Sequence, residues 1–243
     1  MKILILFITL FNIFQFSQAQ TNFTNQGSSN QVTVEQIDTA IIKGPAGPAA
    51  IIGGDFNQIS IFQGTSGWGV NQVELQTSNN FNIIEIRQAR NEFNFAQGVN
   101  GHFVSLINNG YNISFISQQT NDDTGQHVIF SSINGNNNSA TIFQKNNNTK
   151  TLNLSVTGNN NQIQSLQEGI GSHQTNINLF GSGHSVNVNQ KGVGNHSADL
   201  NLTNSGGAIS VNLLQQGSIN QSYSLTQTCS LPSGCANTIV QGQ

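Results

Sequence analysis

The chain has 243 residues, and only 7% of them are charged, against roughly 25% in ordinary soluble domains. In place of charge it carries 37 Asn, 27 Gln and 25 Gly. A net charge of −3 excludes the cationic surface that phosphate binding needs, so no nucleic acid partner is expected. Asn and Gly are poor helix formers, which excludes helical bundles. An amide-rich disordered tract or a β structure with stacked amides remains.

Residues 1–19 have the pattern of a secretory signal peptide. Lys2 precedes an apolar run from Ile3 to Phe16, and the small residues Ser17 and Ala19 suit cleavage. The apolar run is shorter than the roughly 20 residues that a membrane-spanning helix requires. We therefore expect an exported, extracellular protein whose mature chain starts at about Gln20.

Residues 20–56 are expected to form an N-terminal segment, and residues 57–243 a repeat array. The segment holds a first cassette with strict alternation, Asn30–Gln36, and a Gly/Pro/Ala stretch, Lys43–Gly54, expected as a loop between rungs. Similar cassettes follow with irregular spacing: Asn57–Gln63, Asn71–Leu75, Asn82–Gln88 and Asn91–Gln97.

A period of 23 residues appears in the second half of the chain, where Gln144, Gln167 and Gln190 align. Asn138, Asn161 and His184 align with the same period. A fourth copy is expected to continue this register from Gly207 to Leu213, with Gln215 and Gly217 displaced by two residues. Three further columns are expected: Ile129, Leu152, Thr175, Ala198; Ser131, Leu154, Ile177, Leu200, Tyr223; and Ile133, Val156, Leu179, Leu202, Leu225.

Each half of the repeat alternates polar and apolar residues, which predicts a strand, and Gly/Asn-rich turns separate the halves. Stacked copies would then form an all-β, two-sheet parallel β-solenoid of strand-turn-strand rungs about 4.8 Å apart, about 40 Å long. Identical amides would stack as hydrogen-bonded ladders, and glycines would supply turns with positive φ. The expected ladder and turn residues are Asn138, Asn161, Gln144, Gln167, Gln190, Gln215, Gly169, Gly192 and Gly217.

The ends of such a solenoid would carry strand edges with unpaired N–H and C=O groups. Cassettes run close to both ends of the chain, and the sequence contains no pattern typical of a capping helix. We therefore expect copies to add end to end, as in a filament subunit.

The cassette Asn138-Ser-Ala-Thr-Ile-Phe-Gln144, and Asn161 to Gln167 followed by Gly169, resembles the curlin repeat of curli fibre subunits. The resemblance covers about residues 57–227. It implies a subunit of extracellular functional amyloid with a structural role in biofilm matrix and cell adhesion. The expected partners are further copies, a related nucleator or major subunit and an outer-membrane secretion pore. By position, the segment from Gln20 to Asn30 would serve export.

His127, Lys150, His173 and His196 share one 23-residue column, interpreted as a solvated loop edge rather than a metal or pH-sensing site. Protonation of stacked histidines would still be repulsive, so assembly is expected to slow as the pH falls. Cys229 and Cys235 are expected to close a small disulfide loop.

No enzyme activity and no cofactor are expected, because acidic and basic residues are sparse. The adjacent pair Asp122 and Asp123 is interpreted as a solvated turn. The aromatic residues are expected to pack in the core or between subunits rather than to bind a ligand; they are Trp68, Phe93, Phe95, Phe103 and Phe115. The alternative function is a monomeric β-solenoid that acts as an adhesin or surface-binding protein.

Overall fold

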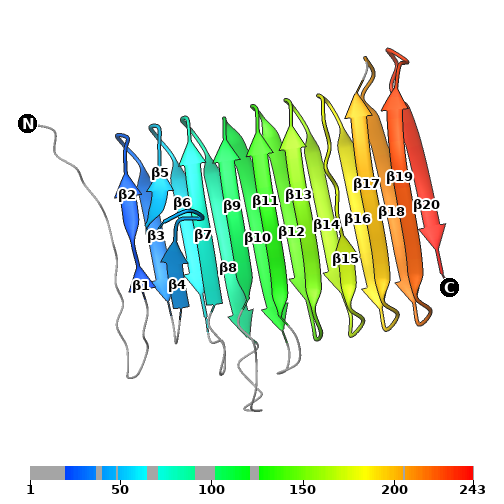
Figure 1. Cartoon of the computed structure of the whole chain (residues 1–243), viewed down its shortest axis with the longest axis horizontal. Helices are drawn as coiled ribbons and strands as arrows, with labels where there is room; N and C mark the ends of the chain where they lie inside the picture. Colours follow the sequence, from blue (N-terminus) through cyan, green and yellow to red (C-terminus); the bar gives the residue numbers. More distant parts are fainter. Residues whose placement is uncertain are drawn as a thin grey trace, which may run out of the picture.

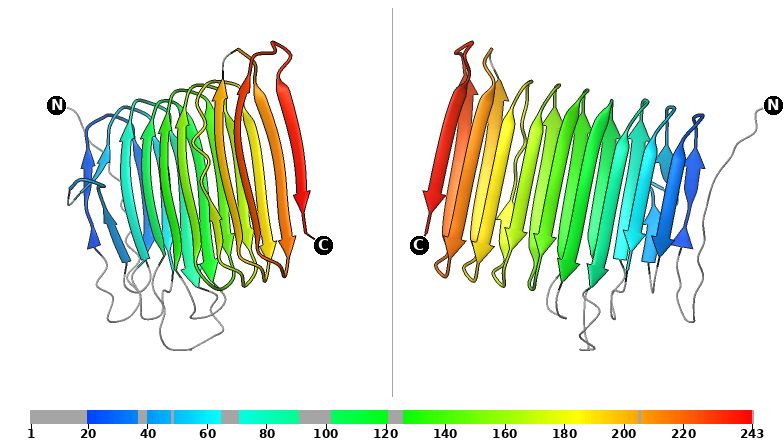
Figure 2. Two further views of the ribbon diagram at one scale, coloured as in Figure 1. Left: turned by 45° about the vertical axis from the view of Figure 1, so that its right-hand side comes forward. Right: turned by 180° about the vertical axis from the view of Figure 1, so that it is seen from behind.

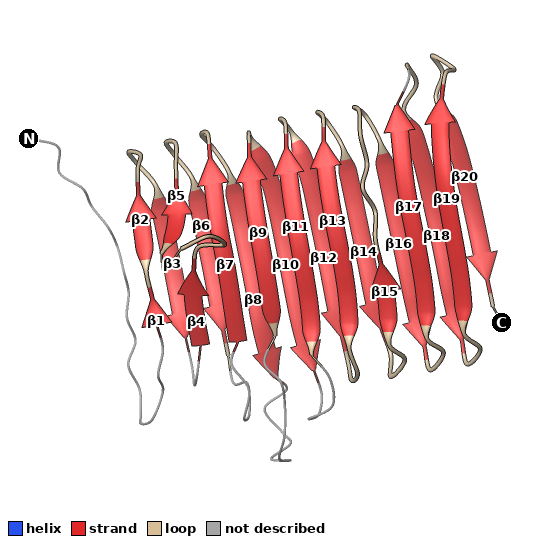
Figure 3. Cartoon of the chain, in the orientation of Figure 1, coloured by secondary structure: helices blue, strands red, loops and turns tan. Residues whose placement is uncertain are grey.

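A computed structural model describes residues 20–36, 40–47, 49–64, 71–90, 102–120, 126–204 and 206–242. Within these ranges all regular structure is β-strand (Figure 3), and no helix long and apolar enough to span a membrane is found. Several features expected from the sequence lie outside the described residues: the signal peptide, the cassette Asn91–Gln97, Trp68, Asp122 and Asp123.

The strands form two parallel sheets, and the chain passes from one to the other along the molecule (Figures 1 and 2). Sheet A has 11 strands: β1 (Gln20–Thr21), β2 (Phe23–Asn25), β4 (Ala40–Lys43), β5 (Ala50–Ile52), β7 (Asn71–Ser78), β9 (Phe103–Asn109), β11 (His127–Asn134), β13 (Lys150–Thr157), β15 (His173–Thr175), β17 (His196–Asn204) and β19 (Gln221–Cys229).

Sheet B has nine strands: β3 (Gln31–Gln36), β6 (Gln58–Gln63), β8 (Ile83–Arg90), β10 (Asn112–Thr120), β12 (Asn138–Lys145), β14 (Gln162–Glu168), β16 (Ser185–Gly192), β18 (Ile209–Gly217) and β20 (Cys235–Gln241). A rung is defined here as one turn of the chain, a sheet A segment followed by a sheet B strand. The first rung holds β1, β2 and β3, and the last holds β19 and β20. The predicted two-sheet parallel β-solenoid is therefore confirmed.

The interior between the sheets is filled by alternate residues of every strand. In β12 the buried side chains include Ala140 and Ile142, and the polar neighbours Ser139 and Thr141 point outward. The predicted column Ile129, Leu152, Thr175 and Ala198 is confirmed, because each member pairs with the next one. Burial of each large aliphatic side chain contributes about 1.5–3 kcal/mol, and a stack of rungs repeats that gain along its whole length.

The 23-residue spacing holds only in the middle of the array. Asn138 pairs with Asn112 at a spacing of 26, Ile113 pairs with Ile83 at 30, and Gln58 pairs with Gln31 at 27. The extra residues fall between the paired strands, where connections tolerate insertions better than strands do. The spacing is therefore about 25 residues over the whole solenoid.

The register expected after His196 was wrong by two residues. Ala198 pairs with Tyr223 and Leu200 with Leu225. Tyr223 and Leu225 therefore each lie in the column before the one that was expected, which is a shift of two residues. Likewise Val186 pairs with Val211, and Gly207 does not share the column of His184. The two extra residues lie in the turn before Ile209. A shift by two keeps every side chain on the same face of the sheet, so alternation alone does not reveal it.

The stretch Lys43–Gly54 is only in part the loop that was expected. Ala50–Ile52 forms β5, which pairs with β2 and β7. The loop that leaves the sheet, called the excursion here, is confined to the residues between β4 and β5. Because β4 and β5 both pair with β7, the excursion interrupts a rung and does not separate two rungs. A further difference is β15, which ends at Thr175 although Ile177 and Leu179 remain buried in their columns.

Candidate functional site

A ladder of glutamines runs through the whole solenoid near the end of each sheet B strand. At every step the Nε2 amide of one glutamine donates to the Oε1 of the glutamine in the next rung, over 2.7 to 3.0 Å. The members are Gln36, Gln63, Gln88, Gln118, Gln144, Gln167, Gln190, Gln215 and Gln241. All bonds point the same way along the axis, so the ladder has a direction.

The same glutamines also join the two sheets. The Nε2 of Gln167 donates to the carbonyl of Thr151 in sheet A over 2.9 Å, and Gln144 bonds the carbonyl of Val128 over 3.2 Å. Both hydrogens of each amide are therefore used, one along the ladder and one across the interior. These hydrogen bonds satisfy the side-chain amides of Gln144 and Gln167, which are fully buried.

A second ladder, of asparagines, lies at the start of the sheet B strands. The Nδ2 of Asn161 donates to the Oδ1 of Asn138 over 3.0 Å, and Asn138 bonds Asn112 in the same way. The Oδ1 of each asparagine also accepts the backbone N–H of the residue above it in the following rung, as Asn138 does from Asn161 over 3.1 Å. His184 ends this ladder, because its backbone N–H bonds Asn161 but its ring is not an amide.

The predicted turn glycines lie one above another after the sheet B strands. Gly169, Gly192 and Gly217 have φ of 107°, 113° and 109°, and Gly192 pairs directly with Gly217. The left-handed region is accessible to glycine without steric cost, which explains why these positions carry no side chain.

Several ladder members were not recognised in the sequence. Asn112 and Gln118 are separated by six residues, as are Asn138 and Gln144, and this spacing was a usable signal. Gln241 stands six residues after Cys235, which occupies the asparagine position in the last rung. Without the leading asparagine, the last cassette does not match the repeat.

The column of His127, Lys150, His173 and His196 is buried, so its interpretation as a solvated loop edge was wrong. Each member is at most 1% exposed. His127 lies two residues before the core residue Ile129, and alternation therefore directs it inward. The rings of His173 and His196 stack with centroids 5.0 Å apart.

Each buried ring binds, through Nε2, a backbone carbonyl at the end of a sheet B strand or just after it. His173 bonds the carbonyl of Glu168 over 2.9 Å, and His196 bonds that of Lys191 over 2.9 Å. A carbonyl only accepts, so Nε2 carries the proton and Nδ1 is bare in the neutral ring. The Nδ1 atoms of His127, His173 and His196 lack hydrogen-bond partners among the described residues. Three or more His, Cys, Asp or Glu side chains do not gather into a metal site in that part of the chain.

Burial lowers the pKa of the titratable groups in this column. Desolvation lowers the pKa of His173 to about 4, helped by the nearby charge of Lys150 and by His196. Desolvation, then His102 and Lys150, lowers the pKa of His127. Desolvation also lowers the pKa of Lys150 to about 8. The Lys150 ammonium donates to the carbonyls of Asn147 and Gly171, each over 2.6 Å.

The stability of the solenoid is expected to fall between pH 6.5 and pH 4. In this window the histidine of the unfolded chain binds a proton that the folded His173 does not bind. Proton binding therefore stabilises the unfolded state and lowers the free energy of unfolding. With a folded pKa of about 4, His173 alone should cost about 3 kcal/mol by pH 4. Urea unfolding of His173→Asn, at concentrations too low for assembly, should show a correspondingly smaller loss between pH 7 and pH 4. An equal loss in both proteins would contradict this origin of the pH dependence.

The remaining predicted residues have clear positions. Cys229 and Cys235 form a disulfide with an S–S distance of 2.10 Å. Phe103 and Phe115 are half-buried, and their rings pack at a tilt against Phe130 and Phe143 of the next rung, with centroids 5.3 and 5.4 Å apart. These pairs lie on the outer faces of the sheets rather than in the core. The other half of the expectation, packing between subunits, stays a prediction.

Within the described residues, no further strand pairs with the outer edge of either end rung of the solenoid. Each end rung has a strand edge in both sheets: β1 to β3 at one end, and β19 and β20 at the other (Figure 1). The inward residues of β19 and β20 are only half-buried, except Cys229, whereas their counterparts in β17 and β18 are buried. Within the described residues no helix covers either end. Neighbouring rungs normally cover such residues, so each end is a surface suited to receive another rung.

The fold and the ladders define a two-sheet parallel β-solenoid with amide-stacked rungs and open ends. Comparison of the chain with protein-family models, curated proteins and solved structures finds no match.

Proposed function

We propose that the chain is a secreted subunit that assembles end to end into extracellular fibres of the curli kind. The observation that carries the proposal is the pair of open end rungs on a solenoid whose internal rungs are held by strand edges and stacked amides. A second copy supplies the same groups that each internal rung receives from its neighbour. A structural role in biofilm matrix and cell adhesion would follow from such fibres.

The proposal includes the path out of the cell. We infer export directed by residues 1–19, passage through an outer-membrane pore, and assembly at the cell surface with a related nucleator or major subunit. The first described residues, Gln20–Asn25, pair with β4 and β5 as part of the solenoid. An export role for this segment therefore requires that the chain crosses the pore before the first rung folds.

A structural rather than enzymatic role agrees with the chemistry of the site. Most of the buried polar side chains are amides, which bond one another in the two ladders. The two ion pairs of the described residues join Lys43 to Glu74 and Arg87 to Glu85 on the sheet surfaces. Amide ladders stabilise stacking because identical neutral groups both donate and accept, whereas identical charges in a column repel.

Fibre formation is expected when the purified chain stands at micromolar concentration in neutral buffer. Thioflavin fluorescence should rise after a lag, electron microscopy should show unbranched fibres, and added fibre fragments should shorten the lag. A chain that remains monomeric for days, with or without added fragments, would contradict the proposed function.

One observation favours the alternative, a monomeric surface-binding protein. Phe56, Phe81 and Tyr111 form an exposed aromatic row across three rungs, with Phe56 and Phe81 stacked 5.1 Å apart. Exposed Ile83 and Ile113 lie beside it. Exposed apolar patches of this kind mark binding surfaces. If this row is the functional surface of a monomeric protein, Phe81→Ser would abolish adhesion while the chain stays folded and monomeric, as the wild type would be.

A further inference from the structure

The asparagine ladder shows what a rung needs from the rung that follows it. The Oδ1 of Asn138 accepts the backbone N–H of Asn161, and the Oδ1 of Asn161 accepts that of His184. The Nδ2 of Asn138 donates to the carbonyl of Gly158, which also belongs to the following rung, over 2.8 Å. An asparagine at this position therefore depends on the rung that follows.

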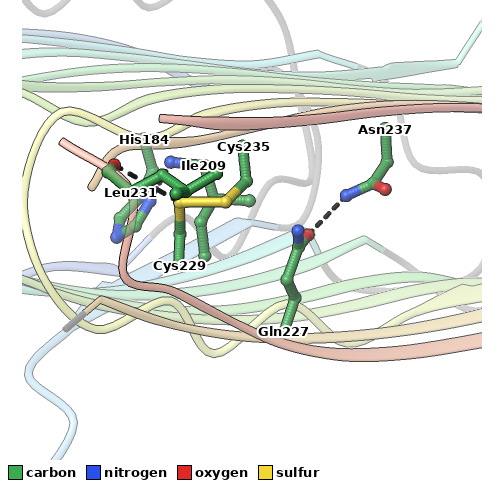
Figure 4. The surroundings of a disulfide bond; sticks show 7 residues. All are labelled: His184, Ile209, Gln227, Cys229, Leu231, Cys235 and Asn237. Atoms are coloured by element: carbon green, nitrogen blue, oxygen red, sulfur yellow. Dashed lines mark hydrogen bonds between the residues drawn. A yellow bond between two sulfur atoms is a disulfide. The ribbon is translucent and has the colours of Figure 1, made fainter. Parts of the chain in front are cut away.

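Among the described residues no rung follows the one formed by β19 and β20, and here a disulfide replaces the amide. Cys235 pairs with Ile209 and so stands in the asparagine column. Cys229 is the last residue of β19, on the other side of the turn that joins β19 to β20. Their bond joins the two strands directly, with Cα atoms 5.9 Å apart (Figure 4). The C-terminal rung is thus closed covalently and keeps its shape as a free surface.

The two end surfaces are complementary when the C-terminal rung of one copy lies on the N-terminal rung of another. Following each column through the rungs places Leu225 on Phe23 and Ile239 on Val34. These four side chains are only partly buried in the single chain and pack at the edges of its core. In these two columns apolar residues would therefore cover apolar residues, as they do between internal rungs. The neighbouring column of sheet B places Asn237 on Val32.

The polar groups match in the same orientation. Gln241 would lie on Gln36, which continues the glutamine ladder with its donor end facing the acceptor end. Gln227 would lie on Asn25, whose buried Nδ2 has no hydrogen-bond partner among the described residues. In the single chain the Oε1 of Gln227 accepts from Asn237 across the interior (Figure 4). A carbonyl oxygen has a second lone pair for a further donor.

The opposite orientations lack this match. Two C-terminal rungs face to face would bring two donor ends of the glutamine ladder together, and two N-terminal rungs would bring two acceptor ends together. Only one orientation also extends both sheets with parallel strands, as in every pairing between rungs of the described solenoid.

We propose that the disulfide-closed C-terminal rung is the docking surface for the N-terminal rung of a second copy, so that assembly proceeds head to tail. The inference rests on the proposed self-assembly and specifies the two surfaces and their orientation. The partner is a second copy of this chain, recognised by a matched glutamine donor and acceptor and by the apolar columns beside them.

Two blocked variants test the orientation. Gln36→Lys blocks the N-terminal surface, and Gln241→Lys blocks the C-terminal surface. At ten times the concentration at which the wild type assembles, each variant alone should remain monomeric by light scattering. Their equimolar mixture should form a dimer of one chain of each kind and stop there. Gln31→Lys and Thr238→Lys, outward positions on the same strands, are matched controls that should form fibres.

Other results would overturn the inference. A homodimer of either variant alone would show face-to-face assembly. A mixture that stays monomeric, while the wild type and the controls form fibres, would show that these two surfaces do not meet. A wild type that forms no fibres would overturn the proposed function, and the head-to-tail inference with it.

The role of the disulfide is tested in the same assay by changing one partner at a time. Cys229→Ser with Cys235→Ser should weaken the dimer at least tenfold when placed in the Gln36→Lys chain, which contributes its C-terminal surface. The same changes in the Gln241→Lys chain should leave the dimer unchanged. Equal weakening in both chains, or none in either, would contradict a docking role for the closed rung.

Discussion

The double variant Gln167→Lys with Gln190→Lys is expected to lose the folded solenoid, and with it all fibre growth. Both side chains are fully buried, and their amides bond each other over 3.0 Å. The change places two ammonium groups about 4.8 Å apart and leaves the amide of Gln144 without its acceptor. An uncompensated buried ion costs several kcal/mol, and two approach the whole stability of a domain, about 5–15 kcal/mol.

Lys150 shows when the interior accepts an ammonium group. Its Nζ donates to two turn carbonyls, and its column neighbours His127 and His173 have lowered pKa values that keep them neutral near pH 7. Lysines at positions 167 and 190 would be charged neighbours of each other. Circular dichroism should therefore show loss of the β signal.

The matched control places the same two lysines on the outer face of the same strands. Gln164 and Asn187 pair with each other across β14 and β16 and point outward. The control variant Gln164→Lys with Asn187→Lys should fold with a melting temperature within a few degrees of the wild type. If the buried pair of lysines melts at the same temperature as this control, the stabilising role of the ladder is contradicted.

The second large effect is expected for Gly158→Ala. Gly158 has a φ of 129°, and an added Cβ would lie 1.8 Å from the carbonyl oxygen of Gly181 in the next rung. The clash is with backbone, so the two turns must separate. For alanine, the left-handed conformation destabilises the folded state by about 1–2 kcal/mol. The forced shift of the two turns destabilises it by about a further 1–3 kcal/mol.

A loss of about 3 kcal/mol should lower the melting temperature by about 10 °C in a chain of this size. Gly47→Ala is the matched control, because an added Cβ there meets no atom within 4 Å. Thermal unfolding of both variants measures the difference. Equal melting temperatures would mean that the turns are not held at the spacing that the structure shows.

The fold could be predicted from the sequence because two signals agreed. Alternation identified the strands, and the recurrence of Gln144, Gln167 and Gln190 identified the stacking. Alternation does not depend on turn length, so it still identified strands in the first half, where the spacing is irregular. The fixed recurrence does depend on turn length and was visible only where the spacing stays at 23 residues. Turn length did hide the register after His196, because a shift by two residues preserves alternation.

The buried histidine column shows what was missed within a correct fold. Because histidine and lysine are polar, the column was expected to be exposed to solvent. The alternation from Ile129 back to His127 already indicated a position in the interior. The decisive information is the backbone carbonyl that each Nε2 reaches, as Glu168 at the end of β14 provides for His173. Such a partner depends on the path of the backbone between the two strands, which composition and spacing do not describe.

The number of chains per length of fibre tests most directly the central claim that whole solenoids stack end to end. Nine sheet B strands at about 4.8 Å each predict one chain per about 43 Å of a single filament, measured by scanning transmission electron microscopy. A value of one chain per about 4.8 Å, as in a flat cross-β layer, would contradict the stacked solenoid.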